Sequence, residues 1–206
     1  MKLAHHNDPW DYITVENFLN EEDWKNIQDL AMEELERYRV EGPNTPRGKY
    51  IHFLDYDLLP QANFLFKEHK YHRPFEGKLK KIVHWAIQPP GNKYPIHIDN
   101  ESRIHTTMLY IAPEESVGTI LCKNRSPHVK DHGPAAYESD YEIEVPWEPN
   151  KIFSHNTREG VTWHRYQSDD IGNRISLSTF FVDPSKVIPG RGIEEYLLDL
   201  DSKYYE

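Results

Sequence analysis

The sequence has very little cysteine: Cys122 is the only one in 206 residues. One thiol cannot form a disulfide within the chain, and it is too few for a structural zinc site built from thiolates. A lone cysteine also fits a reducing compartment. We therefore expect a fold that is held together by its core, and we expect any metal ligands to come from other residue types.

Positive charge and long apolar runs are also scarce. The chain carries 24 Lys and Arg residues against 34 Asp and Glu residues, which gives a formal net charge of −10. Such a chain lacks the basic surface that attracts nucleic acid or an anionic membrane. No apolar run is long enough to span a bilayer, and residues 1–8 lack the apolar block of a signal peptide. We expect a cytoplasmic protein with no nucleic-acid or membrane partner, whose oligomeric state stays open.

The first part of the chain predicts a short strand at residues 12–15 followed by a long helix. Asn20 is suited to cap that helix, and Asp23 stands where a capping box places a carboxylate. Apolar residues then recur at three- and four-residue steps from Trp24 to about Tyr38, as on one face of a helix. Beyond it, we expect residues 50–71 to form a loop with one short helix.

From residue 79 onward the pattern changes to short apolar or alternating runs that are separated by turn residues. Eight such runs predict strands: Lys81–Gln88, Tyr94–Asp99, His105–Ala112, Gly118–Cys122, Tyr141–Val145, Lys151–Ser154, Val161–Tyr166 and Arg174–Val182. Many short strands at this spacing are typical of a jelly-roll double sheet. Helices followed by strands argue for an α+β fold. We expect one domain, with a helical part at about 1–78, a β core at about 79–183 and a C-terminal extension at 184–206 that forms a short helix.

A polar connection at residues 123–140 interrupts the strands and is long for a compact domain. Segments of this kind are irregular or act as lids over a site. His128 and His132 are four residues apart within it, so on a helix they would share a face and could bind a metal. Flanking Pro and Gly residues favour a loop instead.

The segment that points to a metal site contains His97 and Asp99. On a strand, residues two positions apart point to the same face. A histidine and a carboxylate side by side form two thirds of the two-histidine, one-carboxylate triad that binds non-haem Fe(II). His164, on a later predicted strand, is the best candidate for the third ligand.

A second feature strengthens this interpretation. The strand that begins ten positions after His164 places Arg174 and Ser176 on one face, and Ile175 and Leu177 on the other. An arginine inside an apolar sheet is costly unless it meets an anion, and its planar fork suits a carboxylate. Iron beside a carboxylate site suggests 2-oxoglutarate, with one carboxylate on the metal and the other on Arg174.

These residues carry a resemblance to a known family. The chain resembles the Fe(II)/2-oxoglutarate-dependent dioxygenases, and among them the prolyl-hydroxylase type. The resemblance extends over most of the chain and is densest in these segments: Pro90–Tyr94, His97–Asn100, Arg103–Tyr110, Trp163–His164 and Arg174. It implies a double-stranded β-helix, or jelly-roll and cupin-like core, with supporting N-terminal helices.

The resemblance also implies roles for individual residues. His97, Asp99 and His164 would bind iron, while Arg174 would bind the distal carboxylate of 2-oxoglutarate with help from Tyr110. The expected reaction consumes O2, hydroxylates a C–H bond of an amino-acid residue or small metabolite, and releases succinate and CO2. Ascorbate is the expected accessory reductant.

Three further residues are candidates for the pocket. Gln88 stands about where prolyl hydroxylases have a tyrosine near the cosubstrate, and Tyr94 matches an aromatic residue that lines the active site. Trp163 either packs beside the metal-binding histidine or touches substrate at the pocket mouth. A peptide residue, a free amino acid and another metabolite all remain open as substrates.

Two other functions remain open at the level of sequence. A cupin-like metalloenzyme that does not use 2-oxoglutarate would have no need for Arg174. A non-catalytic jelly-roll protein that binds a ligand would have no reason to keep all three metal ligands. For Ser176 and Tyr110, ordinary packing within a strand also remains open.

Overall fold

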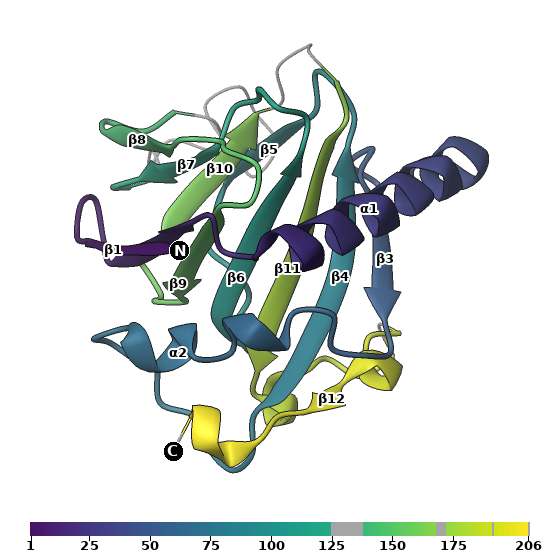
Figure 1. Cartoon of the computed structure of the whole chain (residues 1–206). Coiled ribbons are helices and arrows are strands. Elements are labelled where there is room, and N and C mark those ends of the chain that lie inside the picture. Colours follow the sequence, from purple (N-terminus) through teal and green to yellow (C-terminus); the bar gives the residue numbers. More distant parts are fainter. Residues whose placement is uncertain (125–137, 168–171, 191, 206) are drawn as a thin grey trace.

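The computed structural model describes residues 1–124, 138–167, 172–190 and 192–205, and these form two antiparallel sheets (Figure 1). The larger sheet contains eight strands: β1 (Lys2–His6), β2 (Tyr12–Glu16), β3 (Tyr50–Leu54), β4 (Lys80–Gln88), β6 (Arg103–Ala112), β9 (Ile152–Asn156), β11 (Arg174–Val182) and β12 (Leu198–Asp199). The smaller sheet contains four strands: β5 (Lys93–His97), β7 (Thr119–Cys122), β8 (Glu142–Val145) and β10 (Trp163–Gln167). Each of the eight predicted runs overlaps a strand, which confirms the prediction of two sheets. The run predicted to end at Asp99 ends at His97, so Asp99 lies two residues beyond β5.

The strand order shows how the two sheets are built from one chain. The large sheet runs β1-β2-β9-β6-β11-β4-β12, and β3 also pairs with β4. The small sheet runs β5-β10-β7-β8. Consecutive strands therefore alternate between the sheets through most of the β core, and strands that are far apart in the sequence become neighbours.

Helix α1 (Glu21–Glu41) lies across the outer face of the large sheet (Figure 1). The Asn20 side chain accepts a hydrogen bond from the Asp23 backbone N–H at 2.9 Å, so the predicted N-cap is confirmed. The helix ends at Glu41, three residues beyond the predicted end. It is followed by the C-cap Gly42, whose φ of 73° lies in the left-handed region that favours glycine. Its buried face packs with the outward side chains of β4, β6 and β11 in the main core. None of the described helices has the length and apolar character needed to cross a bilayer.

The segment 1–78 is less helical than predicted. Besides α1, α2 (Leu65–Glu68) and the 3₁₀ helix η1 (Pro60–Ala62), it contributes β1, β2 and β3 to the large sheet. The prediction of a loop was wrong for β3, which pairs with β4 from Tyr50 opposite Ile87 to Leu54 opposite Val83. The three middle residues of β3 are all half-buried, so this strand lacks the alternation of buried and exposed residues that marks a strand in a sequence.

The prediction of a short C-terminal helix was also wrong. Single 3₁₀ turns form at η3 (Pro184–Lys186), η4 (Glu194–Tyr196) and η5 (Ser202–Tyr204). Between the last two turns, β12 pairs with the start of β4, where Leu198 is opposite Lys81. β12 and β3 therefore cover successive parts of the same edge of β4.

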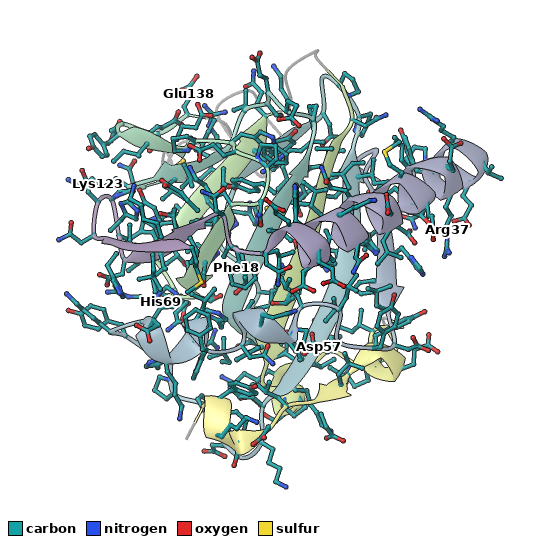
Figure 2. The ribbon with its side chains drawn as sticks, in the orientation of Figure 1. Phe18, Arg37, Asp57, His69, Lys123 and Glu138 are labelled. Carbon is teal, nitrogen blue, oxygen red and sulfur yellow. The ribbon has the colours of Figure 1, made fainter. Side chains whose placement is uncertain are left out.

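A buried lysine ties the segment before α2 to the large sheet. Lys81 on β4 is 1% exposed, and its Nζ donates to Asp57 Oδ1 at 2.6 Å and to the Leu59 carbonyl at 3.1 Å. Asp57 lies in the connection between β3 and α2, below α1 in Figure 2. Burial lowers the pKa of Lys81 to about 8, while Asp57 opposes that shift.

The two faces of β11 separate the core from the space between the sheets. Ile175 and Leu177 point outward into the main core with α1. Arg174 and Ser176 point inward, toward the small sheet, and line a cavity. The predicted division of this strand into an apolar and a polar face is confirmed.

Candidate active site

A cavity of about 300 Å³ lies between the two sheets. Its walls come from β4, β6, β9 and β11 on one side, from β5 and β10 on the other, and from the segment that leads into β3. Of the nine predicted site residues, seven line it: His97, Asp99, His164, Arg174, Ser176, Gln88 and Tyr94. The cavity thus joins the predicted metal ligands and the predicted anion site in one space.

His97 and His164 present the same ring nitrogen to the cavity. They are opposite each other in the pairing of β5 with β10, and their ring centroids are 4.3 Å apart. Nδ1 of His97 donates to the Pro95 carbonyl oxygen at 2.9 Å, and Nδ1 of His164 donates to the Thr162 carbonyl oxygen at 3.0 Å. Both Nε2 atoms therefore remain free as ligands.

Asp99 completes the group. One ligand atom from each of His97, Asp99 and His164 lies within 4.8 Å of the other two. Oδ1 of Asp99 accepts from Arg103 Nη1 at 2.8 Å, and Oδ2 accepts from the Thr106 hydroxyl at 2.7 Å. These contacts fix the orientation of the carboxylate between the two sheets.

The protonation states of Asp99 and His97 suit a divalent metal. Burial opposes the charged form of Asp99, but Arg103 and the neighbouring histidines outweigh it and hold the pKa of Asp99 well below its usual range. Burial, aided by His164, lowers the pKa of His97 far below its ordinary value. An ionised carboxylate beside a neutral imidazole is the state in which both groups bind metal.

His155 on β9 is a neighbour of this group that the sequence did not indicate. Its Nε2 lies 3.7 Å from Asp99 Oδ2, and its ring packs edge-on against His164 at 5.3 Å. Burial, with a contribution from His164, lowers its pKa to about 4. His155 is thus a neutral ring that packs behind two of the ligands.

Arg174 is buried at the other end of the cavity, with 2% of its surface exposed. Its Nη1 donates to Gln88 Oε1 at 3.0 Å, and its Nε has no hydrogen-bond partner within the described ranges. Among the described residues no carboxylate forms an ion pair with it. A buried guanidinium with spare donors and no counter-ion is suited to bind an anion from outside the chain.

Aromatic rings surround this guanidinium. Its Cζ lies 3.9 Å from the ring centroid of Tyr166, 4.7 Å from that of Trp147 and 5.3 Å from that of Tyr110. The Tyr110 ring is stacked on Trp147, and its hydroxyl is hydrogen-bonded to Thr119 at 2.8 Å. Tyr110 therefore contributes its ring to the arginine site, while its hydroxyl is engaged elsewhere.

The remaining predicted residues divide into two groups. Tyr94 lines the cavity and contacts His97 edge-on, with ring centroids 4.5 Å apart. Trp163 is not among the lining residues, and its carbonyl accepts a hydrogen bond from Trp10. Trp163 thus lies at the start of β10, outside the set of residues that line the cavity. His128 and His132 lie outside the described residues.

Besides His155, the polar lining residues that the sequence interpretation missed include Arg47, Lys49, Arg103 and Thr106. Arg103 and Thr106 follow Asp99 in a segment that the resemblance already marked, so their closeness in sequence was an available signal. Arg47 and Lys49 lie in a polar segment with no motif. Only the pairing of β3 with β4 brings that segment to the cavity.

Comparison with known proteins gives a likeness at the level of structure alone. No protein-family model matches the sequence, and no curated protein matches it. Among solved structures, a prolyl-4-hydroxylase from Pseudomonas putida is similar with a TM-score of 0.54 and 15% identity, over 83% of this chain and 91% of that one. The chain has a prolyl-hydroxylase-like oxygenase fold.

Two further solved structures are similar to this chain, and these two proteins catalyse different reactions. A prolyl hydroxylase from Trichoplax adhaerens, in complex with a hypoxia-inducible-factor peptide fragment, matches with a TM-score of 0.56 and 14% identity, over 84% of each chain. SnoK, a non-haem α-ketoglutarate-dependent carbocyclase from nogalamycin biosynthesis, matches with a TM-score of 0.53 and 13% identity, over 84% of this chain and 79% of that one. Sequence identities this low show only that the chain has the same fold as the three solved structures. The chemistry must therefore be argued from the residues of the cavity.

Proposed function

We propose that this protein is an Fe(II)- and 2-oxoglutarate-dependent oxygenase, built on a double-stranded β-helix, that hydroxylates a C–H bond. One observation carries the proposal. The metal-binding group of His97, Asp99 and His164 shares a cavity with Arg174, a buried cation that has no counter-ion among the described residues.

The donor set fits Fe(II). Two imidazoles and one carboxylate are the ligands of the non-haem Fe(II) triad, which leaves coordination positions for cosubstrate and O2. Both Nε2 atoms are free because each Nδ1 is occupied by a backbone carbonyl. Asp99 is ionised and is held at both oxygens, so the chain supplies a preorganised site.

The far end of the cavity fits a carboxylate. Arg174 has spare N–H donors, and Ser176 faces the same cavity two residues further along β11. A dicarboxylic keto acid that binds the metal at one end would place its other carboxylate here. When bound, iron, 2-oxoglutarate and O2 supply an oxidant for C–H hydroxylation, with succinate and CO2 released.

The chain's own residues then have defined tasks. His97, Asp99 and His164 hold the metal, and Arg103 with Thr106 keeps Asp99 in place. Arg174 orients the cosubstrate, while Gln88 fixes one arm of the guanidinium. The substrate class proposed from the resemblance is an amino-acid residue or a small metabolite.

The first test measures cosubstrate binding without turnover. Anaerobic addition of Fe(II) and 2-oxoglutarate to the protein should produce a weak visible charge-transfer band. Arg174→Gln should weaken 2-oxoglutarate binding at least about tenfold and leave Fe(II) binding intact, because the variant keeps all three metal ligands. His97→Ala should lose both. Lys25→Gln, on the exposed side of α1, is the matched surface control and should behave like the unaltered protein.

The second test separates this function from its two rivals. Formation of succinate from 2-oxoglutarate in air should depend on Arg174. Metal-dependent activity that is unchanged in Arg174→Gln would favour a metalloenzyme that does not use 2-oxoglutarate. Absence of the visible band in the unaltered protein would favour a jelly-roll protein that binds a ligand without catalysis, and it would contradict the proposal.

A further inference from the structure

The cavity has more positive charge than the proposed cosubstrate and metal ligands account for. Five cationic side chains line it, and Asp99 is the one acidic residue among its described lining residues. The five are Arg47, Lys49, Arg103, Arg165 and Arg174. In a chain with a formal net charge of −10, this concentration of cations is a local feature of the cavity.

Three of these cations have a defined partner. Arg103 donates to Asp99, and Arg165 forms two hydrogen bonds with the Glu142 carboxylate, at 2.8 and 3.0 Å. Arg174 is assigned to 2-oxoglutarate by the proposed function. Arg47 and Lys49 remain, and within the described ranges neither side chain makes a hydrogen bond or an ion pair.

A built turn presents Arg47 and Lys49 to the cavity. The Thr45 hydroxyl donates to the Lys49 carbonyl at 2.8 Å and accepts from the Lys49 backbone N–H at 3.0 Å. Gly48 adopts a φ of 72° within this turn, and the Asn92 side chain donates to the Arg47 carbonyl at 2.6 Å. The two side chains are therefore held by a hydrogen-bonded backbone rather than by an open loop.

Tyr94 connects this pair of cations to the metal ligands. The Arg47 guanidinium lies 4.4 Å from the Tyr94 ring centroid, and Lys49 Nζ lies 5.3 Å from it. The same ring contacts His97 at 4.5 Å. Both cations thus contact an aromatic ring that also contacts a candidate metal ligand, on the side of the cavity formed by the segment before β3.

The position of Lys49 is unfavourable without an anion. The side chain is half-buried, and burial, with smaller contributions from Arg103 and Arg174, lowers its pKa to about 8, an effect that Asp99 only partly opposes. An ammonium group that is partly desolvated among other cations costs free energy unless a negative group joins it. Groups that are perturbed in this way cluster at functional sites.

We propose that Arg47 and Lys49 form a subsite for an anionic group, a carboxylate or a phosphate, of the substrate to be hydroxylated. This inference rests on the proposed function and narrows the substrate class. The target is an acidic small molecule or an acidic residue rather than an uncharged prolyl residue. A guanidinium fork and an ammonium point charge together suit an oxyanion with two or three acceptor atoms.

The test measures binding of paired probes to the full chain with Fe(II) and 2-oxoglutarate under anaerobic conditions, by calorimetry. The carboxylate pair is N-acetyl-aspartate methylamide and N-acetyl-asparagine methylamide. The phosphate pair is N-acetyl-phosphoserine methylamide and N-acetyl-serine methylamide. At least one acid should bind about tenfold or more tightly than its neutral partner, and the pair that shows this identifies the anion.

Substitutions assign that preference to the subsite. Lys49→Gln and Arg47→Gln should each reduce the acid's advantage about tenfold, Lys49→Arg should retain it, and Lys25→Gln should leave it unchanged. The dissociation constant for 2-oxoglutarate, read from the visible band, should change less than about twofold in Lys49→Gln.

Each contrary result has a distinct meaning. A visible band in the unaltered protein with no preference for either acid would overturn the subsite and leave the proposed function standing. A loss of 2-oxoglutarate affinity in Lys49→Gln as large as that in Arg174→Gln would also overturn it, because Lys49 would then belong to the cosubstrate site. Absence of the band in the unaltered protein would overturn the proposed function instead.

Discussion

His97 on β5 and His164 on β10 are direct partners across two strands, and each ring is fixed by a backbone carbonyl two residues earlier in the chain. The ring centroids are 4.3 Å apart. Because the backbone rather than other side chains orients both rings, the metal site depends on the correct pairing of β5, β10 and the remaining strands of the small sheet.

Gly118, just before β7, lies where two strands of the small sheet approach closely, and a substitution there tests how much the fold depends on that approach. A Cβ at this position would lie 1.6 Å from the Val145 carbonyl oxygen on β8, so no side chain fits without a shift of the backbone. Gly118→Ala should lower the free energy of unfolding by about 3 kcal/mol, measured by urea denaturation. In Gly172→Ala the nearest atom outside the adjoining residues would be 4.0 Å away, so this control should remain within about 0.5 kcal/mol of the unaltered protein. Equal effects of the two substitutions would refute this account of the close strand approach.

Thr106 should affect metal affinity without changing charge. Its hydroxyl donates to Asp99 Oδ2 at 2.7 Å, and Thr106→Val removes that hydrogen bond with little change in shape. We expect the affinity for Fe(II) to fall about tenfold, because such contacts hold a ligand in its binding orientation. Anaerobic calorimetry with Fe(II) gives the measurement. Thr179→Val, on the opposite face of the adjacent strand β11, is the control, and a loss of the same size there would contradict the assigned role.

The residue at position 88 should control how tightly Arg174 binds the cosubstrate. Gln88→Glu places a carboxylate where the amide oxygen now accepts from Nη1 at 3.0 Å, so the chain would neutralise its own anion site. The dissociation constant for 2-oxoglutarate should rise about tenfold or more, equivalent to about 1.4 kcal/mol, with Fe(II) affinity unchanged. Gln88→Met removes the hydrogen bond without adding charge and should have a smaller effect. Identical constants for the two variants would rule out internal neutralisation.

Histidines buried behind the cavity should make the fold sensitive to acid. Burial lowers the pKa of His105 to about 3, and a hydrogen bond from its Nδ1 to Asn156 at 2.7 Å only partly opposes this. The unfolded chain takes up a proton on this residue below about pH 6.5. The folded chain takes it up only near pH 3. Stability from His105 is therefore present above pH 6.5 and falls as the pH drops, by about 2 kcal/mol between pH 7 and pH 5.

The variant His105→Gln isolates this contribution. It should be less stable at pH 7, yet its free energy of unfolding should decline less steeply toward pH 5. Urea denaturation at pH 7, 6 and 5 compares the two slopes. Parallel profiles for the variant and the unaltered protein would show that His105 is not held in its neutral form.

The β core and the candidate metal-binding group were predictable because local pattern carried the information. The eight short runs indicated the strands, and the closeness of His97 and Asp99 in the chain indicated that their side chains would meet, although β5 ends at His97 and Asp99 lies two residues beyond it. The identity of Arg174 as an inward residue followed from its apolar neighbours on the other face of β11. These inferences needed no knowledge of which strands are adjacent in space.

The features that the sequence did not reveal depend on pairing between distant strands. β3 and β12 are short edge elements whose place is fixed by β4, so their own residues alternate weakly. Arg47 and Lys49 reach the cavity only because β3 lies along that edge. Trp163 was a candidate either for packing beside His164 or for the pocket mouth; it is not among the lining residues, and its carbonyl accepts a hydrogen bond from Trp10.

The order in which the ligands occur along the chain has a consequence for synthesis. His97 and Asp99 leave the ribosome 65 or more residues before His164, and β11 follows later still. A nascent chain therefore carries two of the three ligands for some time without the strand that pairs them with the third. If iron is bound as proposed, the complete set of three ligands exists only after β10 has paired with β5.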